Sequence, residues 1–204
     1  KLQKNQGETI TDDSSLFHLS KRNIKIINGE IKNKKITYTS DIQYESYVKF
    51  GIGFDIHPLE TGYPLVLGGV QIDYSHGLVG HSDADVLTHA VIDSLLGAGA
   101  LGDIGDHFPA DDPQYSGVSS ILLLQRTAAI LKAANLRVVN IDATIVAENP
   151  RLSPFRDAMR QNIADALSIE VNYVSVKATT AEGLDSIGNG HGISAQAVAS
   201  LEQA

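Results

Sequence analysis

The chain is 204 residues long, which favours one main domain with or without an appendage. It contains no Cys, so disulfide frameworks, thiolate nucleophiles and cysteine-based zinc fingers are excluded. Its formal net charge of −8 and its aromatic content of 6% argue against a nucleic-acid reader and against attraction to an anionic membrane surface. No apolar run approaches the ~20 residues that a membrane span needs, so we expect neither nucleic acid nor membrane as a partner.

Composition divides the chain near Tyr47. Residues 1–47 carry eight Lys and Arg against six Asp and Glu and contain no Ala, whereas residues 48–204 carry eight against eighteen and contain all twenty Ala. We therefore interpret residues 1–47 as a poorly ordered N-terminal extension and residues 48–204 as the functional domain. Because the extension is basic and hydroxyl-rich, it could also be the remnant of a leader for a plastid-type organelle. A protein of the bacterial cytoplasm is the alternative.

The domain begins with a strictly alternating segment, Val48–His57, in which every second residue is apolar. This period predicts a strand with one apolar side, and Pro58 is expected to end it. Gly51 and Gly53 lie on the other, polar side, and we expect them to leave that side open.

The rest of the domain alternates helices with strands. Ser82 is expected to cap a helix that runs to Leu96 and stops at Gly97, and the glycine-rich stretch 97–112 is expected to be a long functional loop. The other expected elements are short strands Leu65–Leu67 and Val70–Ile72, a helix Ser119–Ala134, a strand Val138–Val146, a helix from Ser153 and Pro154 to Leu167, a strand Val174–Ala178, a loop Thr179–Gly192 and a closing strand Ile193–Leu201. This order predicts an α+β fold in which a mixed β-sheet is packed with helices on one side.

A carboxylate and two imidazoles have the spacing of a catalytic zinc site. Asp55 and His57 lie two residues apart on one strand face, and His89 shares a helix stripe with Asp85 and Asp93. Two His and one carboxylate leave a coordination position open for substrate, and Asp85 and Asp93 could orient His89 from behind. The alternative is a polar strand end beside an independently packed histidine, because no local motif as strong as H-E-x-x-H is present.

Three further segments could bind phosphate or ribose. His81 and Ser82 are expected at a helix N-terminus, where backbone N–H groups suit an anion. Lys177–Gly183 ends a strand with a lysine and two threonines, which could clamp a phosphate. Asp103–Gly105 could offer a carboxylate to a ribose diol. Each has an ordinary reading as well: an N-cap, a threonine-rich turn and a loop.

Seven short motifs follow one another through the domain: GFDIHP, LGGV, GLVGHSDADVLTHAVIDSLLGA, GALGDIGDHFP, AENP, VKATTAEGL and GNGHGI. In this order they closely resemble the 2-C-methyl-D-erythritol 2,4-cyclodiphosphate synthase family of the non-mevalonate isoprenoid pathway. The resemblance covers the chain from Val48 to about Leu201 and leaves residues 1–47 outside it.

The resemblance implies a homotrimer of α+β subunits and a phosphorus–oxygen lyase. It implies that Asp55, His57 and His89 bind Zn²⁺ and that Mg²⁺ or Mn²⁺ bridges two substrate phosphates. The implied substrate is 4-diphosphocytidyl-2-C-methyl-D-erythritol 2-phosphate, whose 2-phosphate attacks the β-phosphorus. CMP then leaves and the cyclodiphosphate forms.

The resemblance also implies individual roles. His81 and Thr180 are expected to stabilise the transition state. The residues expected to contact substrate are Asp55, His57, His81, Ser82, Asp103, Ile104, Gly105, Phe108, Asp112, Ala147, Arg151, Leu152, Ser153, Thr179, Thr180 and Glu182. The chain departs from the family near its end, where Asn189 and Gln196 stand in place of a frequent Arg and Glu around a cavity on the trimer axis that accepts isoprenoid phosphates.

The charge of the domain fits a reaction that depends on metals. The substrate is a multiply charged anion, yet the domain carries ten more acidic than basic residues, and Lys177 is the only Lys after Lys132. Metals and backbone donors must therefore neutralise most of the substrate charge. Two alternatives stay open: a zinc-dependent phosphate-ester hydrolase, which would release CMP without a cyclic product, and a trimeric metal-binding scaffold, which would not consume the substrate.

Overall fold

The computed structural model describes residues 25, 29, 37, 38 and 47–204 of the chain. The expectations for the N-terminal extension, both poor order and a leader remnant, concern a segment that is otherwise outside the described residues. Residues from Glu45 to Ala204 make up a single structural unit.

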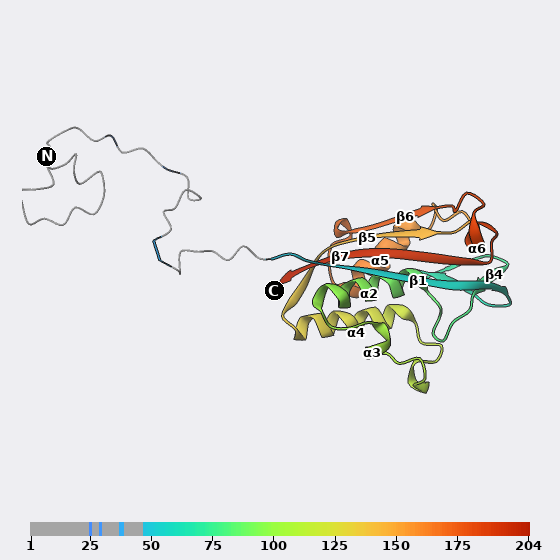
Figure 1. Ribbon diagram of the computed structural model, residues 1–204, viewed down its shortest axis with the longest axis horizontal. Coiled ribbons are helices and arrows are strands. Elements are labelled where there is room, and N and C mark those ends of the chain that lie inside the picture. The colour runs from blue at the N-terminus through green and yellow to red at the C-terminus, as the bar shows by residue number, and fades with distance from the viewer. Residues whose placement is uncertain (1–24, 26–28, 30–36, 39–46) are drawn as a thin grey trace, which may run out of the picture. The chain divides into compact units, whose positions relative to one another are not determined.

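A five-stranded mixed sheet, in the order β4-β1-β7-β5-β6, is the framework of this unit (Figure 1). The strands are β1 (Lys49–Thr61), β4 (His76–Leu78), β5 (Leu136–Val146), β6 (Val174–Thr179) and β7 (Gly192–Gln203). Only β5 and β6 pair in parallel, and the other neighbours are antiparallel. The carboxyl ends of β1, β5 and β6 therefore lie at the same edge of the sheet, and the candidate site residues gather there. A separate hairpin pairs β2 (Leu65–Leu67) with β3 (Val70–Ile72).

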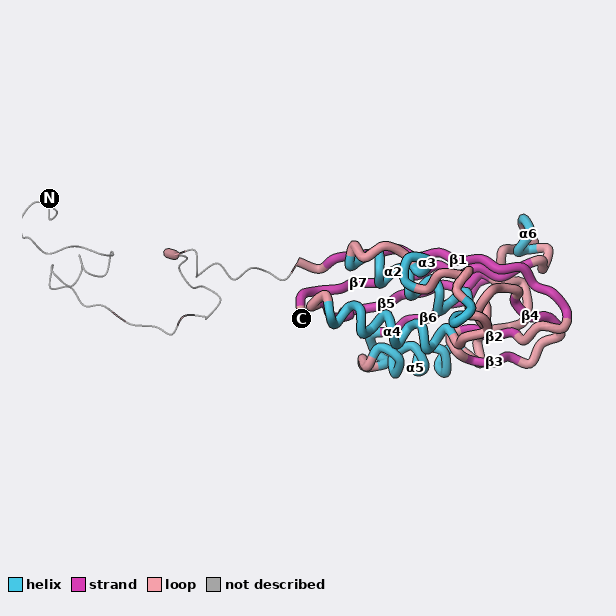
Figure 2. The backbone as a smooth tube through the Cα atoms, turned by 90° about the horizontal axis from the view of Figure 1, so that it is seen from below, coloured by secondary structure: helices cyan, strands magenta, loops and turns pink. Residues whose placement is uncertain are grey.

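Helices cover one face of the sheet (Figure 2). The three long ones are α2 (Val86–Gly99), α4 (Ser120–Ala133) and α5 (Arg156–Leu167), and two single-turn helices, α3 (Ile104–His107) and α6 (Asp185–Gly188), lie in the loops. The core between helices and sheet is made of fully buried side chains such as Leu95, Leu124, Ile145, Ile163 and Ile193. The predicted α+β fold, with a mixed sheet and helices on one side, is confirmed.

The two glycines of β1 are where α2 touches the sheet. A Cβ atom on Gly51 would lie 2.2 Å from the carbonyl oxygen of Ser94, and one on Gly53 would lie 2.0 Å from that of Ala90. No side chain fits between this strand and this helix. The expectation that the glycines leave the polar side of the strand open is therefore wrong, because the helix backbone fills that space.

Pro58 does not end β1. Pro58 pairs with Gly192 of β7, and the Pro58 carbonyl accepts a hydrogen bond from the Val79 N–H at 3.0 Å. The N–H of Leu59 donates to the carbonyl of His191 at 2.9 Å, so pairing continues on both sides of the proline. From Leu59 onward the strand pairs with β4, a three-residue strand that the sequence pattern did not reveal.

Helix α2 is capped by Asp85, not by Ser82 as predicted. The buried Asp85 carboxylate accepts hydrogen bonds from the Thr88 N–H and hydroxyl at 3.0 and 2.7 Å. It also accepts from the N–H groups of Gly68 and Gly69, in the turn between β2 and β3, at 2.9 and 2.7 Å. Burial raises the pKa of Asp85 although all these bonds act to lower it. Asp85 therefore caps the helix and also anchors the distant turn between β2 and β3.

The remaining boundaries differ from expectation by short segments. Helix α2 continues through the predicted stop at Gly97 to Gly99, and the C-cap residue Ala100 adopts the left-handed conformation. Helix α5 begins at Arg156 rather than at Ser153 and Pro154, because a turn closed by the Phe155 N–H and the Leu152 carbonyl comes first. The predicted loops 97–112 and 179–192 contain α3 and α6, and the predictions for α4, β5, β6 and β7 hold to within two residues.

The apolar side of β1 faces away from the helices. Phe50, Ile52 and Phe54 are 71, 64 and 57% exposed, and Ile56 and Val198 beside them are also exposed. Such a patch on a sheet face is typical of a surface that meets another protein chain. Within the part of the chain that the structure describes, no helix is both long and apolar enough to cross a membrane.

We predict that Gly53→Ala lowers the free energy of unfolding by about 1–3 kcal/mol or more, because the added methyl group collides with the α2 backbone. Gly97→Ala is the matched control in the same helix, where the nearest atom to a new Cβ is the Ile52 carbonyl oxygen at 3.9 Å. It should be neutral or stabilise by up to about 1 kcal/mol. Urea unfolding measures both, and equal stability of the two variants would contradict the close packing.

Candidate active site

A carboxylate and two imidazoles meet where β1 contacts the first turn of α2. Asp55 and His57 project from β1, and His89 from α2. The Asp55 Oδ2 atom lies 2.9 Å from His89 Nδ1 and 3.1 Å from His57 Nε2. One ligand atom from each side chain lies within 4.8 Å of the others, and the three form the one such His, Asp and Glu cluster among the described residues. The structure thus brings together the three residues that the sequence proposed as metal ligands.

The electrostatics of the cluster favour positive charge beside Asp55. Burial acts to raise the pKa of Asp55, but hydrogen bonds from His57 and His89 and attraction to both rings hold it well below its usual range. The pKa of His57 is raised, chiefly by its hydrogen bond to Asp55 and against the effect of burial. An anionic oxygen facing two ring nitrogens needs a cation, which is either a proton on a ring or a metal ion.

The donor set fits zinc. One carboxylate oxygen and two imidazole nitrogens are ligands that Zn²⁺ prefers, and three protein ligands leave a fourth position open. All three side chains are partly accessible, with exposed fractions of 24, 21 and 14% for Asp55, His57 and His89. A small anion could therefore reach the cluster.

The expected supporting partners of His89 are wrong. Asp85 is committed to the helix cap, and Asp93 accepts a hydrogen bond from the Ile104 N–H at 2.8 Å. The second nitrogen of His89, Nε2, instead lies 2.8 Å from the hydroxyl of Ser120 and 3.1 Å from that of Ser82. Ser120 belongs to α4, 31 residues along the chain, and no spacing in the sequence points to it.

The bond from Ile104 to Asp93 fixes the loop after α2. Asp103 caps α3 and shares a capping box with Asp106, so Asp103, Ile104 and Gly105 are held one helix turn beyond His89. Burial raises the pKa of Asp93, the Ile104 N–H lowers it, and the charges of Asp103 and Asp55 raise it further.

The other expected contacts along this loop are spread out. Phe108 is buried, with its ring edge-to-face against Tyr115, and Asp112 is partly exposed at the start of the turn Pro113–Tyr115. His81 is exposed, and its carbonyl accepts from the Gly117 N–H at 3.0 Å. Because α2 begins at Val86, His81 and Ser82 precede the helix. The prediction that they lie at a helix N-terminus, whose N–H groups would bind an anion, is therefore wrong.

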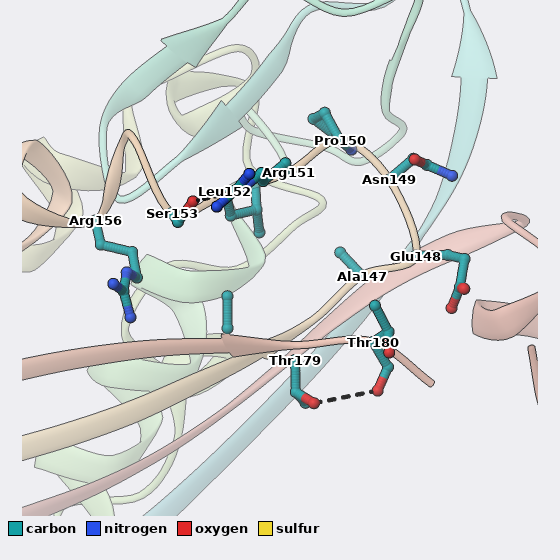
Figure 3. Close-up of a pocket in the computed structure, with 11 residues that line it drawn as sticks. Ala147, Glu148, Asn149, Pro150, Arg151, Leu152, Ser153, Arg156, Thr179 and Thr180 are labelled. Carbon is teal, nitrogen blue, oxygen red and sulfur yellow. Dashed lines mark hydrogen bonds between the residues drawn. The ribbon is translucent and has the colours of Figure 1, made fainter. Parts of the chain in front are cut away.

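A pocket of about 310 Å³ opens at the carboxyl ends of β5 and β6. In Figure 3 the loop Ala147–Ser153 arches over the end of β6, where Thr179 and Thr180 lie. The pocket thus brings together six of the residues expected to contact substrate: Ala147, Arg151, Leu152, Ser153, Thr179 and Thr180. Glu182 lies beside it and accepts a hydrogen bond from the Thr180 hydroxyl at 2.8 Å.

Two cationic side chains near this pocket, Lys177 and Arg156, differ from the sequence prediction. Lys177 forms an ion pair with Asp142 at 2.5 Å and does not line the pocket, so the expected clamp of phosphate by this lysine is wrong. Arg156, which the sequence argument missed, does line it from the start of α5. Its position just after Pro154, at the predicted opening of a helix, was the available signal.

The candidate metal cluster and the pocket are separate within the chain. No residue of the Asp55, His57 and His89 cluster lines the pocket. Strand β7 lies between β1 and β5, which places the two strands ~10 Å apart, and the pocket loops lie farther along the same sheet edge.

Fold and site together define an α+β domain with a candidate metal centre at the edge of a mixed sheet. The model of the YgbB family matches residues 48–202, and the chain belongs to this family. The 2-C-methyl-D-erythritol 2,4-cyclodiphosphate synthase of Syntrophomonas wolfei is 57% identical over 157 residues, which are 77% of this chain and 100% of that enzyme. The resemblance drawn from the seven motifs is thereby confirmed.

Other relatives extend over residues 1–47 as well. The bifunctional enzyme IspD/IspF of Desulforudis audaxviator is 47% identical over 208 residues, which are 99% of this chain and 53% of that enzyme. The solved bifunctional IspDF of Campylobacter jejuni matches with a TM-score of 0.76 and 34% identity, over 100% of this chain and 56% of that one. This chain therefore spans about half the length of these bifunctional relatives. A solved IspF of Plasmodium falciparum in complex with CDP matches with a TM-score of 0.68 and 31% identity, over 78% of this chain and 98% of that one.

Proposed function

We propose that residues 48–204 convert 4-diphosphocytidyl-2-C-methyl-D-erythritol 2-phosphate into 2-C-methyl-D-erythritol 2,4-cyclodiphosphate with release of CMP. The observation that carries this proposal is the Asp55, His57 and His89 cluster within a domain of the YgbB family. Relatives that are 57 and 55% identical, matched over 100 and 84% of their own length, are named as this synthase, a lyase of the non-mevalonate isoprenoid pathway. The CDP held by the Plasmodium relative supports a cytidine nucleotide as part of the substrate.

Asp55, His57 and His89 would hold Zn²⁺, which supplies a Lewis acid and a template for phosphate oxygens when bound. The proposal also includes Mg²⁺ or Mn²⁺ as a second cation, which would neutralise charge on the substrate phosphates. The charge of the domain supports a role for metal ions, because the domain is strongly acidic and Lys177 forms an ion pair with Asp142. Protein cations alone therefore cannot balance the substrate.

The chain's own groups position the substrate. Ser153, Thr179 and Thr180 place hydroxyl groups around the pocket, and Arg151 adds a cation, so the pocket suits the cytidine diphosphate. The loop Asp103–Gly105, with Phe108 and Asp112, would hold the erythritol moiety beside the metal cluster. His81 and Thr180 would stabilise the charge that develops on the transferred phosphoryl group, which is the main demand of phosphoryl transfer, and Ser82 would contact the substrate beside His81.

We further propose a homotrimer in which each active site is shared between two subunits. The metal cluster would come from one subunit and the pocket from its neighbour, which accounts for their separation within one chain. The exposed apolar face of β1, with Phe50, Ile52 and Phe54, supplies a surface for the contact. Head-to-tail contacts of this kind close into rings.

For residues 1–47 we propose correspondence with the part of the bifunctional relatives that precedes their synthase part. The alignments that reach this segment are with bifunctional enzymes, whereas the synthase of Syntrophomonas wolfei matches 77% of the chain. The family match also begins only at residue 48. The bacterial relatives give no support to an organelle leader and favour the bacterial alternative.

The reaction itself is the first test. With substrate, Zn²⁺ and Mg²⁺, the protein should form CMP and the cyclodiphosphate in equal amounts. Phosphorus NMR measures both products. His81→Ala and Thr180→Ala should each lower turnover by about 10²–10³-fold while bound zinc is unchanged, because each removes a charge-stabilising contact without touching the metal. CMP without cyclic product would instead indicate a hydrolase, and normal turnover in both variants would refute the two roles.

The shared site predicts a specific pattern of complementation. His89→Ala and Thr180→Phe should each be inactive alone, but random mixed trimers of the two should recover about a quarter of the sites, because an intact metal cluster then meets an intact pocket. Activity of co-expressed, differently tagged subunits is the measurement. Inactive mixed trimers, shown to contain both tags, would place the whole site within one subunit.

Removal of residues 1–47 should leave turnover and zinc content unchanged, because the family match begins at residue 48. The comparison is a chain that starts at Val48 against the full chain in the same assay. A shortened chain that is folded by circular dichroism and yet inactive would show that the segment takes part in catalysis.

A further inference from the structure

A buried hydroxyl holds the far side of the His89 ring. Ser120, the first residue of α4, is completely buried, and its Oγ lies 2.8 Å from His89 Nε2. The same hydroxyl donates a hydrogen bond to Asp83 Oδ1. The backbone N–H of Ser120 donates to the other oxygen of that carboxylate, Asp83 Oδ2, at 2.9 Å. Asp83 in turn donates its own N–H to the Val118 carbonyl at 3.2 Å, so it is fixed to the start of α4.

The donors and acceptors in this chain of contacts allow only one direction. An ionised carboxylate can only accept, so the single proton of the Ser120 hydroxyl points to Asp83. Towards His89 the hydroxyl therefore offers a lone pair, and His89 Nε2 must carry the hydrogen. In the neutral ring the other nitrogen, Nδ1, then has a free lone pair.

That lone pair points into the metal cluster. His89 Nδ1 faces Asp55 Oδ2 at 2.9 Å, so two acceptors oppose each other unless a cation lies between them. His57 has the equivalent arrangement, because its Nε2 faces Asp55 and its ring also bonds the backbone of Val79. Both histidines thus present one nitrogen to the cluster while the protein holds the other.

We propose that Ser120 and Asp83 are positioning residues, which fix His89 as the Nε2–H tautomer and aim its Nδ1 at the metal ion. This inference rests on the proposed zinc centre and names the part of the chain that prepares it. Ser82, at 3.1 Å from the same nitrogen, is a second and longer acceptor. Metal-bound histidines typically depend on such a partner for affinity.

Ser120→Ala removes the acceptor and should weaken zinc binding by about 10–100-fold, measured by competition with a chelating dye. Ser119→Ala is the matched control, because Ser119 is the neighbouring N-cap residue and its side chain makes no capping hydrogen bond. It should bind zinc like the parent. His89→Ala sets the scale for loss of a ligand.

Asp83→Asn tests the direction of the hydrogen bonds with little change of shape. The Ser120 N–H still needs an acceptor, so the amide oxygen should face it and the amide nitrogen should donate to the hydroxyl. The hydroxyl proton then turns to His89 Nε2, which forces the ring hydrogen onto Nδ1 and opposes metal binding. We expect weaker zinc binding with an unchanged melting temperature of the zinc-free protein. A ¹⁵N spectrum of labelled histidine should show hydrogen on Nε2 in the zinc-loaded parent.

These experiments distinguish failure of the zinc centre from failure of the roles of Ser120 and Asp83. A parent protein that binds no zinc overturns the metal centre and this inference together. A parent that binds zinc, with Ser120→Ala and Asp83→Asn folded and equally tight, overturns the inference alone. Hydrogen on Nδ1 of His89 in the zinc-loaded parent overturns it as well.

Discussion

The contact between α2 and β1 is the constraint on which the site depends. Gly51 and Gly53 let the helix backbone approach so closely that a Cβ on either would lie about 2 Å from a helix carbonyl. At this separation His89, in the first turn of α2, reaches Asp55 on the strand at 2.9 Å. A wider gap would leave a carboxylate and a histidine on β1 with no third ligand. The packing of two backbones therefore assembles the candidate metal centre.

One stripe of α2 then connects this centre to its surroundings. Asp85, His89 and Asp93 lie on successive turns, and each binds a different part of the chain. Asp85 anchors the turn between β2 and β3, His89 meets Asp55 and the start of α4, and Asp93 holds the start of α3. The loops that would surround the substrate are thus fixed by one rigid helix, which is the support that a preorganised site needs.

The sequence predicted the elements and ligands whose signals are local, and it failed where distant contacts decide. Alternation over Val48–His57 and the apolar period over Ser119–Ala134 predicted a strand and a helix correctly. The cap of α2 was misplaced at Ser82 because Asp85 gains from Gly68 and Gly69, which no local rule includes.

The candidate site shows the same division. The candidate ligands Asp55, His57 and His89 could be named from strand spacing and motif order, and the structure brings these three side chains together. The residues that hold these side chains in place could not be named from the sequence. Ser120 contacts His89 only because α4 packs beside α2, and Asp93 binds the Ile104 N–H and not His89 as predicted. The glycines of β1 were seen but misread, since a residue without a side chain does not tell which neighbour needs the space.

The most direct test of this account is a crystal of the zinc-loaded protein measured at the zinc absorption edge. We expect one anomalous peak per chain, about 2.0–2.2 Å from Asp55 Oδ2, His57 Nε2 and His89 Nδ1. A zinc peak at other residues, or bound through Nε2 of His89, would contradict it.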